Sequence, residues 1–138
     1  MHLKCPFSAA LIRGLAACPN AEEVVRRGGS EFDCRCERHH ATCSDLYGRL
    51  KAQALPAFGV EDDLTSMPHS VLVKIQCGGM LGVARLVDGA EQQPAAMADL
   101  AALIDRALAR YGSTADVPYA ALEPDITGFR LERRARRG

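Results

Sequence analysis

The segment from Cys34 to Cys43 carries three cysteines and two histidines within ten residues, a density found nowhere else in the chain. Thiolate sulfur and neutral imidazole are the ligands that zinc and iron prefer. The segment therefore predicts a metal site in the first third of the sequence. We interpret the chain as that of a small metal-binding protein.

Four cysteines form the leading predicted ligand set. Cys34 and Cys36 are one residue apart, close enough to bind a single ion or one edge of a cluster. Cys43 follows seven residues after Cys36, so one turn of the chain can bring it round, and Cys77 completes the set. Iron–sulfur clusters are held by such groups of thiolates. We therefore expect an iron–sulfur cluster, with an electron-transfer or accessory role beside a larger enzyme.

Two glycines, Gly78 and Gly79, follow Cys77 directly and are predicted to contribute to the cofactor site. Because neither residue has a Cβ, their backbone N–H groups can approach a cluster closely. Hydrogen bonds to the sulfur atoms help to set the reduction potential of a cluster.

Zinc is the alternative metal, bound by Cys34, Cys36, Cys43 and one of the two histidines, His39 or His40. Zinc accepts mixed sulfur and nitrogen ligands. Its structural sites usually draw on C-x2-C pairs, however, and this sequence has none. In this interpretation the metal is structural and the protein is an adaptor or regulator.

A thiol-dependent enzyme is the second alternative, with a cysteine such as Cys77 as nucleophile and a histidine as base. The sequence contains no nucleophile-elbow or triad pattern, so no catalytic residue is predicted.

Cys5 and Cys18 are each followed by proline, as is the last cluster cysteine in bacterial ferredoxin motifs. These two thiols can replace two of the proposed ligands or belong to a second site. Cys18 also lies on an apolar stripe, where a cysteine is typically part of the core.

The composition is that of a single domain over residues 1–138. Lysine plus arginine and aspartate plus glutamate number 17 each, so no net charge attracts nucleic acid or an anionic membrane. The exception is a basic C-terminal tail at about residues 130–138, which we interpret as a solvated terminus, with binding to an acidic partner or RNA as the alternative.

No segment is read as a signal peptide or a membrane span. We therefore expect a cytoplasmic location, where cysteines stay reduced and serve as metal ligands, and a protein partner for electron transfer.

Hydrophobic periodicity predicts an α+β fold, a small single domain in which several short helices pack on a short antiparallel β-sheet. Helices are expected over residues 8–17, 20–27, 44–56, 94–111 and 118–123. Strands are expected over residues 70–77, 81–87 and 127–133. The first two strands would be joined by a glycine turn, with a helix starting at Gly79 as the alternative, and the cysteine segment is expected to be irregular.

Overall fold

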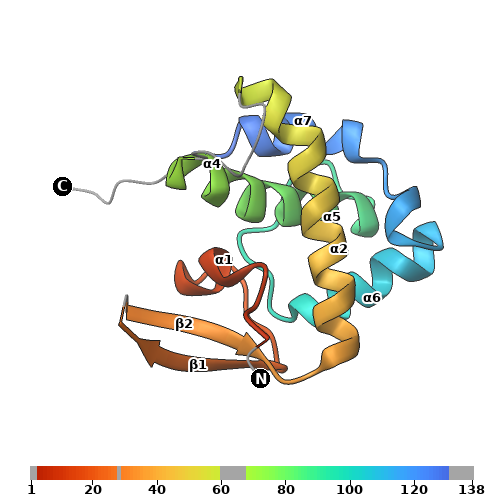
Figure 1. The fold of residues 1–138 in the computed structure, drawn as a ribbon. Helices are drawn as coiled ribbons and strands as arrows, with labels where there is room; N and C mark the ends of the chain where they lie inside the picture. Colours follow the sequence, from red (N-terminus) through yellow and green to blue (C-terminus); the bar gives the residue numbers. More distant parts are fainter. Residues whose placement is uncertain (1–2, 28, 60–67, 131–138) are drawn as a thin grey trace.

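The computed structural model describes residues 3–27, 29–59 and 68–130, and it has the predicted α+β fold (Figure 1). The strands β1 (Ala21–Arg26) and β2 (Gly29–Cys34) form an antiparallel hairpin at one edge of the molecule. The helical elements are α1 (Ser8–Ile12), α2 (Glu37–Ala54), η1 (Leu55–Phe58), α4 (His69–Val73), η2 (Lys74–Gly78), α5 (Gly79–Asp88), α6 (Leu100–Tyr111), η3 (Thr114–Asp116) and α7 (Tyr119–Thr127). Figure 1 shows α2 running from the end of β2 across the molecule toward α7.

The β-hairpin lies where the sequence predicted a helix over residues 20–27, so that prediction is wrong. The guanidinium of Arg26 on β1 binds the carboxylates of Glu31, at 2.9 Å, and Asp33, at 2.7 Å, on β2. Cross-strand pairs of opposite charge stabilise an antiparallel ladder. The capping signal at Asn20 is local, so it contains no information about Glu31 and Asp33, which follow later in the chain.

Helix α2 begins at Glu37, well before the predicted start at Ser44, so most of the cysteine segment is helical rather than irregular. Cys36 is the N-cap residue and has an extended backbone, with φ −124° and ψ 109°. The residues that α2 buries are His39, Cys43, Leu46, Leu50 and Ala54. The buried face confirms the predicted inward positions of the leucines, and it also carries one histidine and one cysteine of the predicted site.

The elements α4, η2 and α5 form one continuous helix, with a π-helical turn at η2. The strands predicted over residues 70–77 and 81–87 are therefore wrong, whereas the alternative of a helix from Gly79 holds for the second half. From residue 75 to residue 84 every position is buried. A helix buried on all sides lacks the polar face by which its period is recognised in a sequence.

Two glycines let this central helix pack directly against α7. A Cβ on Gly78 would lie 2.5 Å from the carbonyl oxygen of Asp125 and 2.8 Å from the Cα of Ile126. A Cβ on Gly82 would lie 2.7 Å from the carboxyl carbon of Asp125. Gly78 is therefore a packing position between helices and not part of the predicted turn.

By length and composition, the continuous helix from His69 to Asp88 could cross a membrane. The sequence had indicated no segment of that length. Within the described residues, 61% of its apolar window is buried by the rest of the protein. Most of the apolar window of this helix is therefore buried in the core of the protein.

Helix α6 confirms the second half of the helix predicted over residues 94–111. Its N-cap is Asp99, whose carboxylate accepts the N–H of Ala102 at 3.0 Å, and Gly112 ends it with a φ of 91°. Most of the predicted core stripe is buried: Met97, Leu100, Ala101, Ile104 and Ala107 are buried, whereas Leu108 and Tyr111 are half-buried. This stripe faces the same core as the buried faces of α2 and α5.

The remaining predictions hold in part. Helix α1 starts at Ser8 as expected but ends at Ile12, and α7 covers the helical turn expected over residues 118–123. The strand predicted over residues 127–133 is wrong where the structure describes it, because Thr127 ends α7 and residues 128–130 are irregular. The rest of that strand and nearly all of the basic tail lie outside the described residues.

Candidate thiolate site

The N-terminal segment lies beside β2 and brings Cys5 close to Cys34. The N–H of Cys5 donates to the carbonyl oxygen of Phe32 at 2.9 Å, and the N–H of Cys34 donates to that of Leu3 at 2.6 Å. These two bonds flank an antiparallel bridge between Lys4 and Asp33. The side chains of the four bonded residues, Leu3, Cys5, Phe32 and Cys34, therefore point to the same face. Cys5 and Cys34 are diagonal neighbours on that face, a relation that spaces residues by roughly 7–8 Å.

Cys18 reaches the same end of the hairpin from the other side. Its carbonyl oxygen accepts the N–H of Ala21 at 3.0 Å, and Ala21 pairs with Cys34 in the strand register. Cys18 is half-buried and packs against the core.

Cys43 comes to this corner on α2. It lies one turn after His39 on the buried face of the helix, and its side chain is 8% exposed. Strand β2 ends at Cys34 and α2 begins at Glu37, so the first turns of α2, which carry Cys43, lie next to the end of the hairpin.

We call Cys5, Cys18, Cys34 and Cys43 the thiol tetrad, because each of the four interacts electrostatically with the other three. Burial raises the pKa of Cys5 to about 11, and the thiols of Cys18 and Cys34 add to the rise. Burial also raises the pKa of Cys43 far above its usual range, with further contributions from the other three thiols. Burial is again the main cause of the raised pKa of Cys34.

The raised pKa values of Cys5, Cys34 and Cys43 describe buried thiols that resist ionisation. A bound cation would lower the pKa of these thiols, because it favours the thiolate form that ligates it. Among the described residues, no three Cys, His, Asp or Glu side chains converge as closely as one metal ion would require.

A second arrangement lies next to the tetrad and consists of Cys36, His39 and Asp105. The Sγ of Cys36 lies 3.3 Å from Nδ1 of His39, and Nε2 of His39 lies 3.0 Å from a carboxylate oxygen of Asp105. The backbone N–H of His39, and then its imidazole, lower the pKa of Cys36. A thiol at a helix N-terminus beside a histidine is a nucleophile in many proteins.

Asn20 also contacts this histidine. Its Nδ2 lies 3.3 Å from Nδ1 of His39 and can donate to that nitrogen. His39 is 8% exposed, whereas Cys36 is half-buried and accessible from solvent. The imidazole thus has contacts at both ring nitrogens, and the cysteine beside it is partly accessible to solvent.

The structure brings Cys34, Cys36, Cys43 and His39 of the predicted site together, and His40 lies near them. His40 is half-buried, and its Nε2 donates to the carbonyl oxygen of Lys4 at 3.1 Å. It ties the helix to the N-terminal segment.

Cys77 lies apart from these residues, inside η2. It is fully buried, and burial raises its pKa to about 11, opposed by the charge of Arg13. None of the other described thiols contributes to this shift, in contrast to the tetrad. Gly79, like Gly78, packs against a neighbouring helix, since a Cβ there would lie 3.0 Å from Cδ1 of Leu50.

Two tetrad members, Cys5 and Cys18, stood outside the leading set predicted from the sequence. Their signal was the proline that follows each of them. Asp105 carried no signal at all, because an acid on the solvent side of an amphipathic helix is read as a solvated charge.

Comparison with family models, with curated proteins and with solved structures found no match. The chemistry of the site is therefore the basis for assigning a function.

Proposed function

We propose that the protein holds an iron–sulfur cluster with the thiol tetrad and exchanges electrons with a protein partner, as an accessory of a larger enzyme. The observation that carries this proposal is that four thiols, supplied by four separate segments of the chain, are near enough to interact electrostatically with one another. Compared with the set predicted from the sequence, Cys5 and Cys18 take the places of Cys36 and Cys77.

The donor set is compatible with an iron–sulfur cluster. All four tetrad donors are thiols, as in most iron–sulfur sites, and four cysteines also hold zinc in structural sites. A single zinc ion with Zn–S bonds of about 2.3 Å needs its ligands in close convergence. A cluster of several irons is larger and spaces its thiolates more widely, which is why we favour it.

The histidines are compatible with the zinc alternative. His39 donates through Nε2 to Asp105, and His40 donates through Nε2 to a backbone carbonyl. A metal-binding histidine commonly makes such a contact with one nitrogen and binds the metal with the other. Ligation through Nδ1 of His39 would replace the contacts of that nitrogen with Cys36 and Asn20.

The burial of the tetrad suits electron exchange. Cys5 and Cys43 are buried, which would shield a cluster from water, while Cys18 and Cys34 are half-buried and would bring one edge near the surface. When bound, the cluster would supply one-electron chemistry. We place the protein in the cytoplasm, where a reducing environment keeps its six cysteines as free thiols.

The deciding experiment is anaerobic purification followed by analysis of iron, zinc and acid-labile sulfide. Iron and sulfide in equal amounts, with the absorption of an iron–sulfur cluster, is the expected result. Stoichiometric zinc without sulfide would establish the structural-metal alternative instead. Folded protein that contains neither metal after anaerobic purification would refute both metal proposals.

The second candidate function is thiol chemistry at Cys36, favoured by its contact with His39 and by the contact of His39 with Asp105. The proton of the thiol would pass to Nδ1 of His39, and the resulting thiolate would attack an electrophilic carbon. Selective alkylation at Cys36 of the metal-free protein, abolished by His39→Ala, is the result that would favour this candidate.

A further inference from the structure

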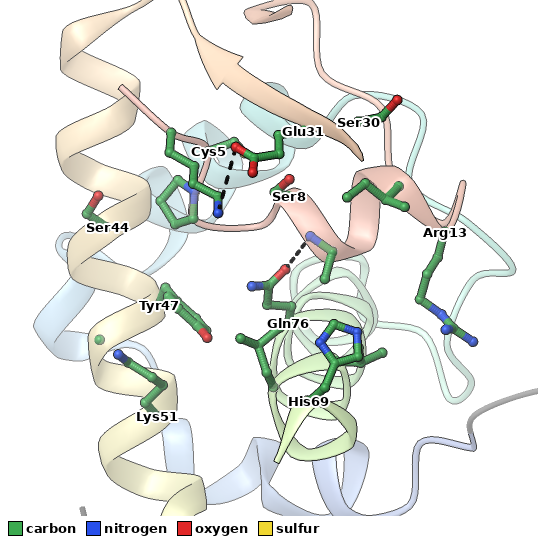
Figure 2. Close-up of a pocket in the computed structure, with 17 residues that line it drawn as sticks. Cys5, Ser8, Arg13, Ser30, Glu31, Ser44, Tyr47, Lys51, His69 and Gln76 are labelled. Carbon is green, nitrogen blue, oxygen red and sulfur yellow. Dashed lines mark hydrogen bonds and ion pairs between the residues drawn. The ribbon is translucent and has the colours of Figure 1, made fainter. Parts of the chain in front are cut away.

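A cavity of about 700 Å³ lies between α1, α2, the α4–η2 helix and β2 (Figure 2). Its volume is within the range of small-molecule binding sites. Ile12, Leu72 and Val73 supply apolar wall, and Ile12 is 55% exposed although it is a large hydrophobic residue. Cys5 also lines the cavity, which therefore borders the thiol tetrad.

The charges around the cavity are mainly positive. Lys4, Arg13 and Lys51 all line it, and Figure 2 shows Arg13 and Lys51 on opposite sides of the cavity. Glu31 is the only acidic residue among the described lining residues. Its carboxylate is already held by Arg26 at 2.9 Å, and Lys4 lies 3.9 Å away. The lining thus attracts an anion.

Gln76 presents hydrogen-bond donors inside the cavity. Its side chain is on the buried η2 turn, and the whole residue is 4% exposed. The Oε1 atom accepts the N–H groups of Ala9, at 2.9 Å, and Ala10, at 3.4 Å. These contacts fix the orientation of the amide, so its NH2 group points away from α1, toward Tyr47 and α2 in Figure 2.

Ser8 provides an independent indication of a ligand site. The residue is 6% exposed, it lines the cavity, and its hydroxyl is buried without a hydrogen-bond partner in the described part of the protein. A buried hydroxyl without a partner destabilises a protein. Such a group is explained if a bound molecule accepts its hydrogen bond.

We propose that this cavity binds a small organic carboxylate with an apolar body. The carboxylate would accept from Ser8 and from the amide of Gln76, with Lys51 on α2 supplying the opposite charge, and the apolar body would lie against Ile12 and Leu72. This proposal concerns a second site and does not depend on the metal content of the tetrad.

The test compares phenylacetate with its neutral analogue phenylacetamide by titration calorimetry on the full-length protein. We expect saturable binding of phenylacetate and roughly tenfold or more weaker binding of the amide, because hydrogen bonds to a charged group are the stronger ones. Equal affinity for both compounds would overturn the proposal. Saturation by inorganic phosphate, with no binding of phenylacetate or hexanoate, would overturn it as well.

Three variants locate the site. Lys51→Gln should weaken phenylacetate binding roughly tenfold, whereas Lys74→Gln, the same change at a lysine that does not line the cavity, should leave it unchanged. Ser8→Ala should weaken binding without lowering the melting temperature of the free protein, since it removes an unsatisfied hydroxyl. A destabilised Ser8→Ala variant with unchanged affinity would show that the serine is structural and would refute its role as a donor.

The outcomes separate this proposal from the iron–sulfur proposal. Phenylacetate binding by protein that contains neither iron nor sulfide would contradict the cluster alone. Iron-containing protein that binds neither carboxylate would contradict the cavity proposal alone.

Discussion

The Nε2 atom of His39 donates to the carboxylate of Asp105 at 3.0 Å, across 66 residues of sequence, and thereby ties the first turn of α2 to α6. An ionised carboxylate only accepts hydrogen bonds, so this contact places a hydrogen on Nε2. The other ring nitrogen, Nδ1, then faces Cys36 at 3.3 Å. Asp105 is therefore a positioning residue for the histidine that contacts the Cys36 thiol.

Replacing Asp105 with alanine should slow the alkylation of Cys36 by iodoacetamide several-fold, because the imidazole loses the acceptor that fixes its orientation. The rate at Cys36 is read by mass spectrometry of peptides from the treated protein. Asp88→Ala, which removes an exposed carboxylate paired with Arg106, is the matched control. An unchanged rate in the Asp105 variant would show that the ring is oriented without this contact.

Serine replacement of tetrad cysteines should abolish cluster binding. Cys18→Ser and Cys43→Ser are each expected to lose most of the iron and sulfide, because each removes one of four thiolate bonds. Cys36→Ser and Cys77→Ala should retain both, since the proposed cluster uses neither thiol. Metal analysis of anaerobically purified variants is the measurement. Loss of iron on changing Cys77, with retention on changing Cys18, would restore the ligand set predicted from the sequence.

Replacing Gly78 with alanine should destabilise the protein by at least about 1–3 kcal/mol, as overpacked cores usually do. The new Cβ would meet the backbone of α7 at 2.5 Å, and a backbone cannot move aside as a flexible side chain can. Gly48→Ala on α2 is the matched control, because a Cβ there meets nothing within 4 Å. That variant should gain roughly 0.5–1 kcal/mol from helix propensity. Urea unfolding measures both free energies, and equal effects of the two changes would contradict the close approach of α7.

Cys77 should make the stability of the protein depend on pH in the alkaline range. Burial raises the pKa of Cys77 from 9.0 to about 11 in the folded protein. The folded state therefore holds this proton more tightly, so the stability it contributes is complete below pH 9 and is lost as the pH rises through 11. Two pKa units correspond to roughly 2–3 kcal/mol.

The measurement for Cys77 is the difference in unfolding free energy between pH 8 and pH 10.5, compared in the metal-free wild type and in Cys77→Ala. The variant lacks the ionisable group, so its loss of stability over this range should be smaller. A loss as large as that of the wild type would mean that Cys77 ionises as readily in the folded chain as in the unfolded one.

Local patterns predicted the amphipathic elements well. The stripe of Leu100 and Ile104 and the cap at the end of α6 were readable because a helix with one polar face shows its period in the sequence. The same holds for the second part of α2, where Leu46 and Leu50 are buried as expected. The central helix was misread because burial on every side removed the period.

The sequence by itself determined the chemistry of this protein: a thiol-rich segment around Cys34, Cys36 and Cys43, with His39 beside it. Only the tertiary structure decided which thiols lie close together. Hydrogen bonds between the N-terminal segment and β2 bring Cys5 to Cys34, and the strand register that pairs Ala21 with Cys34 brings Cys18 to it. Asp105 on α6 reaches His39 at the start of α2. Such contacts depend on strand register and helix packing, which no local pattern encodes. The same packing buried Cys77 in the central helix, apart from the thiols that the sequence had grouped with it.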